Sequence, residues 1–223
     1  RTCLLEGRLP WVCPEVQYPV GAPLGNYPPM QLQALLFVPL SLVFDNDLLC
    51  FNLVWLASLV GNGLGTYILA WYLLRSRPAA LFAGAAVALG TPVMVHAATQ
   101  LENIQLGPFP VFLVAWMRLI DRPTRGRLLA AVATYLLVVM SAPYFGLFAT
   151  FPAALYVAWE ALRARRSKGF RAFLRPRLLP LAGFSAMVLP AAALLFSSQL
   201  WAAWNGLPMA RPDSQFAMFG AAL

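Results

Sequence analysis

The fold is decided by residues 47–77, which read DLLCFNLVWLASLVGNGLGTYILAWYLLRSR. Residues 48–74 form an apolar run, and Arg75 and Arg77 follow it directly. A helix of this length crosses the roughly 30 Å hydrocarbon core of a bilayer with some tilt. Arginines directly after an apolar run are typical of a membrane span that ends in a basic loop. The stretch therefore predicts a transmembrane helix.

The same pattern recurs along the chain. Residues 78–98 form a second apolar run, and residues 104–120 form a shorter one. Residues 128–162 are too long for one ordinary span, and Pro143 marks a break because proline disrupts the preceding helical ladder. We expect two short spans there, or a partly re-entrant arrangement around that proline. With a last span at residues 178–204, the sequence predicts an all-α, polytopic membrane protein with about six transmembrane helices.

The basic residues mark one side of the membrane. Thirteen of the 16 lysines and arginines lie in three clusters between apolar runs. The clusters are Arg75 and Arg77; Arg118, Arg122, Arg125 and Arg127; and Arg163, Arg165, Arg166, Lys168, Arg171, Arg175 and Arg177. Two predicted spans separate each cluster from the next, so all three can face the cytoplasm, as the lysine and arginine bias requires. We expect a multi-pass protein of the inner or plasma membrane with cytoplasmic basic loops.

The composition excludes an ordinary soluble domain, because 61% of the residues are apolar and only 11% are charged. A net charge of +8 can indicate nucleic-acid binding. Here, however, the cations lie at the ends of apolar runs, where they set membrane orientation. We therefore expect the lipid bilayer as a partner and no nucleic acid.

The predicted topology divides the chain into three regions. Residues 1–47 form an outer (periplasmic or extracellular) loop, residues 48–204 the transmembrane core, and residues 205–223 an outer C-terminal segment. Residues 31–44 are apolar but shorter than a span, which favours a helix lying in the outer membrane interface. The chain starts at Arg1 rather than methionine and ends abruptly, which suggests a fragment with a truncated C-terminal segment.

Two cysteines lie on the predicted outer loop. In an oxidising compartment Cys3 and Cys13 can form a disulfide, and two free thiols are the alternative. Cys50 lies at a span entrance with no obvious partner. The spacing does not resemble a zinc site.

Polar residues gather at the turn after the second run. On a continued helix His96, Gln100 and Asn103 would share one face, and Glu102 is close in sequence. These side chains could line one pocket, where a carboxylate beside a histidine can bind a cation, pair with the imidazole or hold a sugar hydroxyl. The alternative is a solvated turn with a capping histidine.

Asp45 and Asp47 stand directly before the first long run. Carboxylates there favour the positive end of the helix dipole and accept bonds from free backbone amides, which is enough to explain them. A divalent metal ion is the alternative, because two acids on one turn can coordinate one.

Gly61 and Gly65 are spaced to lie on one face of the first span. Small residues at this spacing let another helix approach closely, and Asn62 between them can hydrogen-bond across the contact. We expect packing there, with a partner helix as one candidate. A substrate role for Asn62 is the alternative.

Three stretches carry a family resemblance. They are GRLPWVCPEVQYPVGAPLGNYPPMQLQALLFVPL (7–40), FNLVWLASLVGNGLGTYILAWYL (51–73) and HAATQLENIQLGPFPVFLVAWMRLI (96–120). Together they resemble the membrane core of the GT-C glycosyltransferase superfamily, with a looser similarity at SAPYFGLF (141–148). Members have a long first outer loop with an interfacial helix and a histidine- and glutamine-containing outer turn.

The resemblance implies transfer of a sugar from a polyprenyl-phosphate carrier to an acceptor at the outer membrane face. Such chemistry needs a carboxylate base and cations or a metal ion at the departing phosphate. The decisive acid of the family usually follows its first membrane helix, and we expect this chain to begin beyond that point. Glu15 and Glu102 are the remaining catalytic candidates. We expect an outer cavity bounded by the first loop, the 96–102 turn and Tyr144, with Arg211 as a phosphate contact.

Two other functions fit the same sequence. A transporter or flippase for a lipid-linked saccharide would also use a polar rim, although transporters usually show internal repeats, which we do not find. A non-catalytic membrane subunit could pack against partners through Gly61, Gly65 and the alanine-rich residues 79–88.

Overall fold

A computed structural model of the chain describes residues 12–13, 22–23, 30–99, 104–167 and 169–204. Contacts divide the chain into two compact units, residues 30–192 and residues 1–29 with 193–223. In the second of these units, β1 (Val12–Cys13) and β2 (Ala22–Pro23) pair antiparallel, with Val12 opposite Pro23 and Cys13 opposite Ala22. The helix α10 (Ser197–Trp204) also belongs to this unit.

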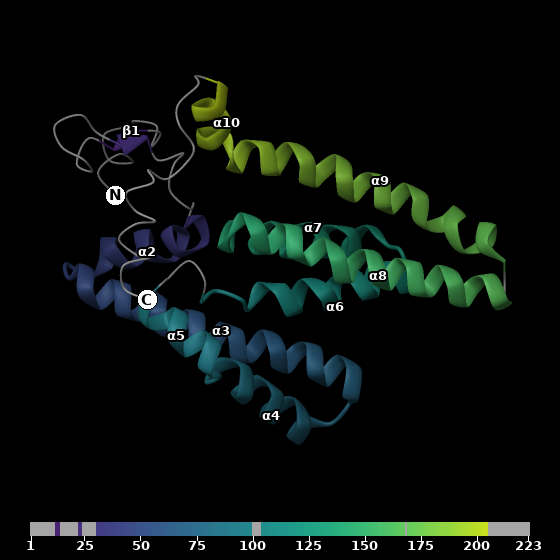
Figure 1. Ribbon diagram of the computed structural model, residues 1–223, viewed down its shortest axis with the longest axis horizontal. Coiled ribbons are helices and arrows are strands. Elements are labelled where there is room, and N and C mark those ends of the chain that lie inside the picture. Colours follow the sequence, from purple (N-terminus) through teal and green to yellow (C-terminus); the bar gives the residue numbers. More distant parts are fainter. Residues whose placement is uncertain (1–11, 14–21, 24–29, 100–103, 168, 205–223) are drawn as a thin grey trace, which may run out of the picture. The chain divides into compact units, whose positions relative to one another are not determined.

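The unit of residues 30–192 is built from helices in its described part (Figure 1). In chain order they are α2 (Gln31–Val43), α3 (Asp47–Leu74), α4 (Arg77–Ala88), α5 (Thr91–Thr99), α6 (Pro108–Asp121), α7 (Arg125–Ser141), α8 (Pro143–Ser167) and α9 (Phe170–Leu195), whose last three residues belong to the other unit. Helix α3 packs against α4 and α6, while α6, α7 and α8 pack against one another. The prediction of a helical protein is confirmed.

Four helical stretches are long and apolar enough to cross a membrane. They are Asp47–Leu74, Arg77–Ala97, Pro143–Ala164 and Phe173–Leu195. The second combines α4 with most of α5. These stretches agree with the predicted runs at residues 48–74 and 78–98, with the second half of 128–162 and with most of the last run. The described part of the chain is therefore that of a helical membrane protein.

The predicted count of about six spans is not confirmed. The runs at residues 104–120 and 128–141 form α6, with 14 residues, and α7, with 17 residues. Both are shorter than the roughly 20 residues that a span needs. They also supply much of the buried core, including Phe112, Trp116 and Val138. Other helices cover these side chains, so their apolar character reflects burial in protein.

The core is rich in aromatic rings. Phe112 lies 5.1 Å from Tyr135 and 6.4 Å from Phe184 between ring centroids, which joins α6, α7 and α9. The indole N–H of Trp116 donates to the carbonyl of Ala153 on α8 at 3.0 Å. In contrast, Phe82 is 78% exposed and Leu179 is 82% exposed. Apolar groups on the outside of such a bundle are in the position where lipid would cover them.

Helix boundaries follow local signals. The side chain of Asn46 accepts a hydrogen bond from Leu49 N at 3.0 Å and caps α3. At the other end Arg75 adopts the left-handed conformation, with φ of 56°. The predicted break before Pro143 is confirmed, because Ala142 is extended and proline begins α8. Proline suits a first helical position because it needs no N–H partner there.

Two predicted boundaries were wrong. The last run was placed at residues 178–204, but α9 already begins at Phe170 and ends at Leu195, before the separate α10. The third basic cluster was expected to form a basic loop, but Arg163 lies on α8 and Arg177 on α9. Arginine has a high helix propensity, so a basic sequence alone does not end a helix. The helix expected at residues 31–44 is present as α2, and its location in a membrane interface stays a prediction.

Candidate functional site

Asn62 holds an irregular segment of the chain against the middle of α3. Its side chain is 1% exposed, its Nδ2 donates to the carbonyl of Ile104 at 2.5 Å, and its Oδ1 accepts from the N–H of Gly107 at 2.7 Å. Residues 104–107 lead into α6 without being helical themselves. The prediction that Asn62 hydrogen-bonds across a close contact is confirmed. Its partner is the backbone of the same chain.

Glycines permit this approach. A Cβ placed on Gly65 would collide with the backbone carbonyl of Gly107, and a Cβ on Gly107 would lie 2.5 Å from the carbonyl oxygen of Gly61. On another side of α3, a Cβ on Gly84 of α4 would lie 2.6 Å from the carbonyl oxygen of Gly63. The backbone of α3 is therefore in close contact with two segments. An additional partner chain at Gly61 and Gly65 stays a prediction.

Both ends of the candidate polar turn are fixed to α3. Before the turn, the indole N–H of Trp55 donates to the carbonyl of Ala97 at 3.0 Å. After it, Asn62 bonds Ile104. Trp55 and Asn62 are seven residues apart, which is about 10.5 Å along a helix. Ala97 and Ile104, the described residues on either side of the turn, are thus each hydrogen-bonded to α3.

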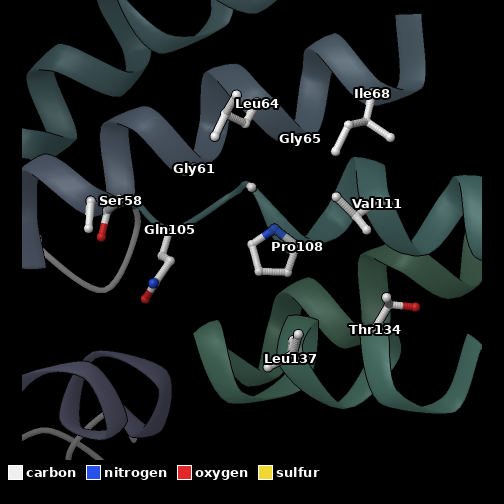
Figure 2. Close-up of a pocket in the computed structure, with 12 residues that line it drawn as sticks. Ser58, Gly61, Leu64, Gly65, Ile68, Gln105, Pro108, Val111, Thr134 and Leu137 are labelled. Carbon is white, nitrogen blue, oxygen red and sulfur yellow. The ribbon is translucent and has the colours of Figure 1, made fainter. Parts of the chain in front are cut away.

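A pocket of about 270 Å³ lies beside this attachment, between α3, α6 and α7 (Figure 2). It is lined by Ala57, Ser58, Gly61, Leu64, Gly65, Ile68, Gln105, Gly107, Pro108, Val111, Thr134 and Leu137. In Figure 2, Ser58 and Gln105 lie at one end, whereas Ile68 and Val111 lie at the other. The pocket therefore has one end with polar side chains, and most of its remaining wall is apolar.

The polar groups of this wall differ in how their hydrogen bonds are satisfied. Ser58 Oγ donates to Val54 O at 2.8 Å, and Thr134 Oγ1 donates to Ala130 O at 2.7 Å. Gln105 is only 7% exposed, and its Oε1 is buried without a hydrogen-bond partner. A buried acceptor without a donor costs about 1–3 kcal/mol. Gln105 is thus the pocket side chain with an unmet capacity to accept a hydrogen bond.

Two of the predicted substrate-binding residues are described. His96 is half-buried on α5, and its Nδ1 is buried without a hydrogen-bond partner. Tyr144, on the first turn of α8, packs against the rings of Phe145 and Phe148 on its own helix. No hydrogen bond or ring contact of the described residues joins His96 to Tyr144. The cavity predicted from the first loop, the 96–102 turn and Tyr144 includes residues outside the described ranges, so it stays a prediction.

The metal candidates at the start of α3 are both exposed. Asn46, which stands between Asp45 and Asp47, provides the N-cap, and Asp47 lies in the first turn. Within the described ranges no group of three or more His, Cys, Asp or Glu side chains could hold a metal ion. A cation bound by these two aspartates stays a hypothesis.

Other predicted residues lie outside the described residues. They are Cys3, Glu15, Gln100, Glu102, Asn103 and Arg211. The predicted disulfide between Cys3 and Cys13 is therefore untested. Cys50 is a buried free thiol, with its Sγ 3.8 Å from the carbonyl of Phe44.

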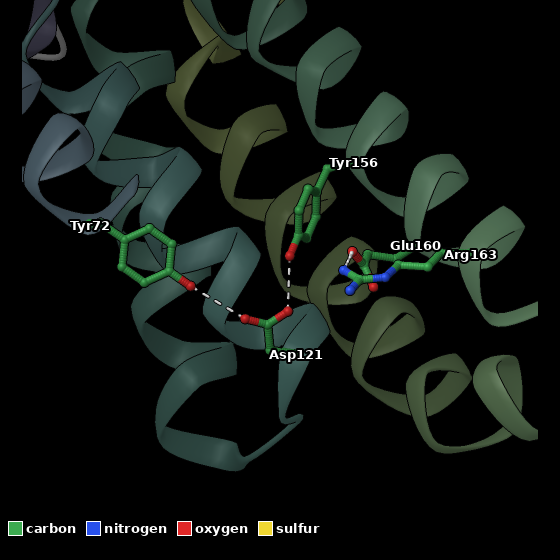
Figure 3. Close-up of polar contacts among 5 residues, drawn as sticks. All are labelled: Tyr72, Asp121, Tyr156, Glu160 and Arg163. Carbon is green, nitrogen blue, oxygen red and sulfur yellow. Dashed lines mark hydrogen bonds and ion pairs between the residues drawn. The ribbon is translucent and has the colours of Figure 1, made fainter. Parts of the chain in front are cut away.

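A second polar cluster lies among the basic helix ends (Figure 3). The hydroxyl of Tyr72 donates to one carboxylate oxygen of Asp121 at 3.3 Å, and that of Tyr156 donates to the other at 2.9 Å. Asp121 thereby joins the C-terminal ends of α3 and α6 to the middle of α8. The sequence analysis missed it because Asp121 lies between Arg118 and Arg122, and the stretch was treated only as a basic cluster. An acid inside such a cluster is the signal that could have found it.

The fold defines the class of this protein as a helical, multi-pass membrane protein. No protein-family model, curated protein or solved structure matches the chain. The function must therefore be argued from the residues and their geometry.

Proposed function

We propose that the chain is the membrane core of a glycosyltransferase that moves a sugar from a polyprenyl-phosphate carrier to an acceptor at the outer face of the membrane. The observation that carries the proposal is the position of the pocket. Its polar end, with Ser58 and Gln105, lies along α3 between the two attachment points of the turn that contains Glu102.

The pocket suits an amphipathic ligand. Leu64, Ile68 and Val111 form an apolar wall that can contact a hydrocarbon chain. The amide of Gln105 at the other end can bind a polar head group. A polyprenyl phosphate has a long hydrocarbon chain with a phosphate head group at one end. It therefore matches a pocket that has an apolar wall and one polar end. With its chain along α3 beside Ile68, its head would lie beside Ser58 and Gln105.

The chemistry requires an acid and groups that stabilise a departing phosphate. In the proposed reaction a carboxylate accepts the proton of the acceptor hydroxyl as the oxygen attacks the anomeric carbon. The bond from that carbon to the carrier phosphate breaks, and the phosphate leaves with the electron pair. Glu102 is the candidate in the turn, and Glu15 is the candidate on the first loop. His96 and Gln100 would bind the sugar or the phosphate, with a divalent metal ion as an additional cation.

The test is transfer of labelled sugar from a panel of polyprenyl-phosphate sugars, measured with the natural full-length protein in membranes. Replacement of the catalytic acid should lower the rate by at least about 100-fold. We expect this of Glu102→Gln or Glu15→Gln. The matched control is Glu160→Gln, since Glu160 pairs with Arg163 among the basic helix ends. No transfer from any carrier sugar would contradict the proposal, whereas transfer at equal rates in all variants would remove Glu15 and Glu102 as the catalytic acid.

A further inference from the structure

Two arginines share one tyrosine ring at the basic end of α3. The guanidinium carbon of Arg75 lies 5.6 Å from the centroid of the Tyr72 ring, and that of Arg118 lies 5.4 Å from it. Arg75 follows the last residue of α3, whereas Arg118 belongs to α6. The tyrosine thus brings together two cations that are 43 residues apart in the sequence.

Two neighbouring arginines donate hydrogen bonds to backbone carbonyls of the chain. Arg127 donates from Nη1 to the carbonyls of Arg118 and Arg122, at 2.8 and 3.1 Å. Arg177 donates to the carbonyls of Ile120 and Phe173, both at 2.7 Å. Apart from the bond to Phe173 on α9, these bonds satisfy carbonyls at the C-terminal end of α6, where cations also complement the helix dipole.

In the described part of the chain, Arg75 and Arg118 make no such bonds to backbone carbonyls. Both are exposed, and within the described part of the chain neither side chain makes a hydrogen bond or an ion pair. The nearby carboxylate of Asp121 instead accepts from Tyr72 and Tyr156. Each guanidinium therefore keeps its N–H donors for a ligand, and planar N–H pairs match phosphate oxygens.

The backbone at Arg75 is also unusual. Arg75 is the one non-glycine residue with a positive φ, 56°, in the described part of the chain. Glycine adopts this conformation at helix ends without a steric penalty, whereas other residues meet a cost of roughly 1–2 kcal/mol. The arginine side chain is present at a position where glycine would be favoured by the backbone.

The surroundings indicate what kind of phosphate would bind. Directly before Arg75, Trp71, Leu73 and Leu74 are 41%, 58% and 61% exposed. They form the end of a helix that is long and apolar enough to span a membrane. A ligand at the two arginines would therefore have exposed apolar side chains beside it, as the acyl chains of a phospholipid require. Basic residues near the membrane surface contribute about 1 kcal/mol each to the attraction of anionic lipids.

We propose that Arg75 and Arg118, held by Tyr72, form a binding site for the phosphate head group of an anionic phospholipid in the surrounding leaflet. Asp121 has a positioning role, since it fixes the hydroxyl end of the tyrosine ring. The site does not depend on the proposed transferase function, and it lies on α3 beyond the pocket.

Native mass spectrometry can test this with the full chain in neutral detergent and phosphatidylglycerol as the probe. The double variant R75Q/R118Q should weaken binding of the first lipid roughly tenfold or more. The matched control R77Q/R125Q removes the same charge from two exposed arginines without ring contacts, and it should change binding less than about twofold. Equal weakening in both variants, or none in either, would reduce the site to non-specific charge and overturn the proposal.

Three further measurements sharpen the result. Arg75→Gly removes the guanidinium but suits the backbone, so it should weaken lipid binding while the melting temperature stays the same or rises. R75K/R118K keeps the charge without the planar donors, and native affinity in this variant would contradict the proposed geometry. Inorganic phosphate is the last probe. Displacement of the lipid at equal phosphate concentration would assign the site to a free anion and exclude the lipid.

Discussion

The side-chain oxygen of Asn62 accepts a hydrogen bond from the backbone N–H of Gly107 at 2.7 Å in a fully buried position. The same side chain donates to the carbonyl of Ile104. One residue therefore bonds two backbone groups of a segment that is not helical. This relationship fixes the start of α6 and one wall of the pocket. It also sets the first prediction.

Replacing Asn62 by leucine should destabilise the protein by about 2–4 kcal/mol, because the buried N–H of Gly107 loses its acceptor and the carbonyl of Ile104 keeps only its bond from the N–H of Leu106. Asn52→Leu on the same helix is the control, since Asn52 is exposed, and it should change stability by less than about 0.5 kcal/mol. Thermal unfolding in detergent, followed by tryptophan fluorescence, measures both. Equal melting temperatures would mean that the segment is not held through this side chain.

Gly65→Ala should cost about 1–3 kcal/mol, because the new methyl group collides with the backbone of Gly107. Gly61→Ala makes a matched control one turn away. A Cβ at Gly61 has no heavy atom within 4 Å, so this change should be neutral or stabilising, since alanine favours a helix. The same unfolding measurement compares the pair. A reversed order of stabilities would refute the close contact.

Gln105→Leu should leave the empty protein as stable as before or slightly more stable, because it removes an unpaired buried oxygen. In transfer assays with polyprenyl-phosphate sugar, its KM should rise roughly fivefold to tenfold if the amide binds the head group. Thr134→Val, at the other end of the pocket, should leave KM within about twofold. An unchanged KM for Gln105→Leu would remove this residue from the site.

Arg177→Gln should destabilise the bundle by about 1–2 kcal/mol. The side chain is half-buried, bonds two carbonyls and lies 4.1 Å from the ring of Phe173. Arg175→Gln, an exposed neighbour, should change stability by less than about 0.5 kcal/mol. Chemical denaturation of both variants measures the difference. Similar losses would indicate a general effect of charge in place of the specific bonds.

Some structural features could be predicted because they depend on local sequence. The long apolar run before Arg75, the break before Pro143 and a buried role for Asn62 between two glycines all follow from neighbouring residues. Hydrophobic length, proline geometry and small-residue spacing act within one or two turns of helix. A single sequence carries these signals directly.

The candidate site could be predicted only in part. The sequence indicated a polar turn after His96. It did not indicate that Trp55 and Asn62 hydrogen-bond to the residues on either side of this turn. The tyrosines that bind Asp121 come from α3 and α8, far from it in sequence. Such contacts depend on how helices pack, and apolar periodicity does not specify which helices become neighbours.

By itself, the sequence determined that this chain is helical and suited to a membrane, because apolar length and clustered arginines are local properties with few structural solutions in lipid. Only the tertiary structure decided that α6 and α7 supply much of the buried core, and that Gly107 lies against Gly65. The physical reason is that lipid and protein interior are similarly apolar. A run of apolar residues therefore does not show whether lipid or another helix covers it.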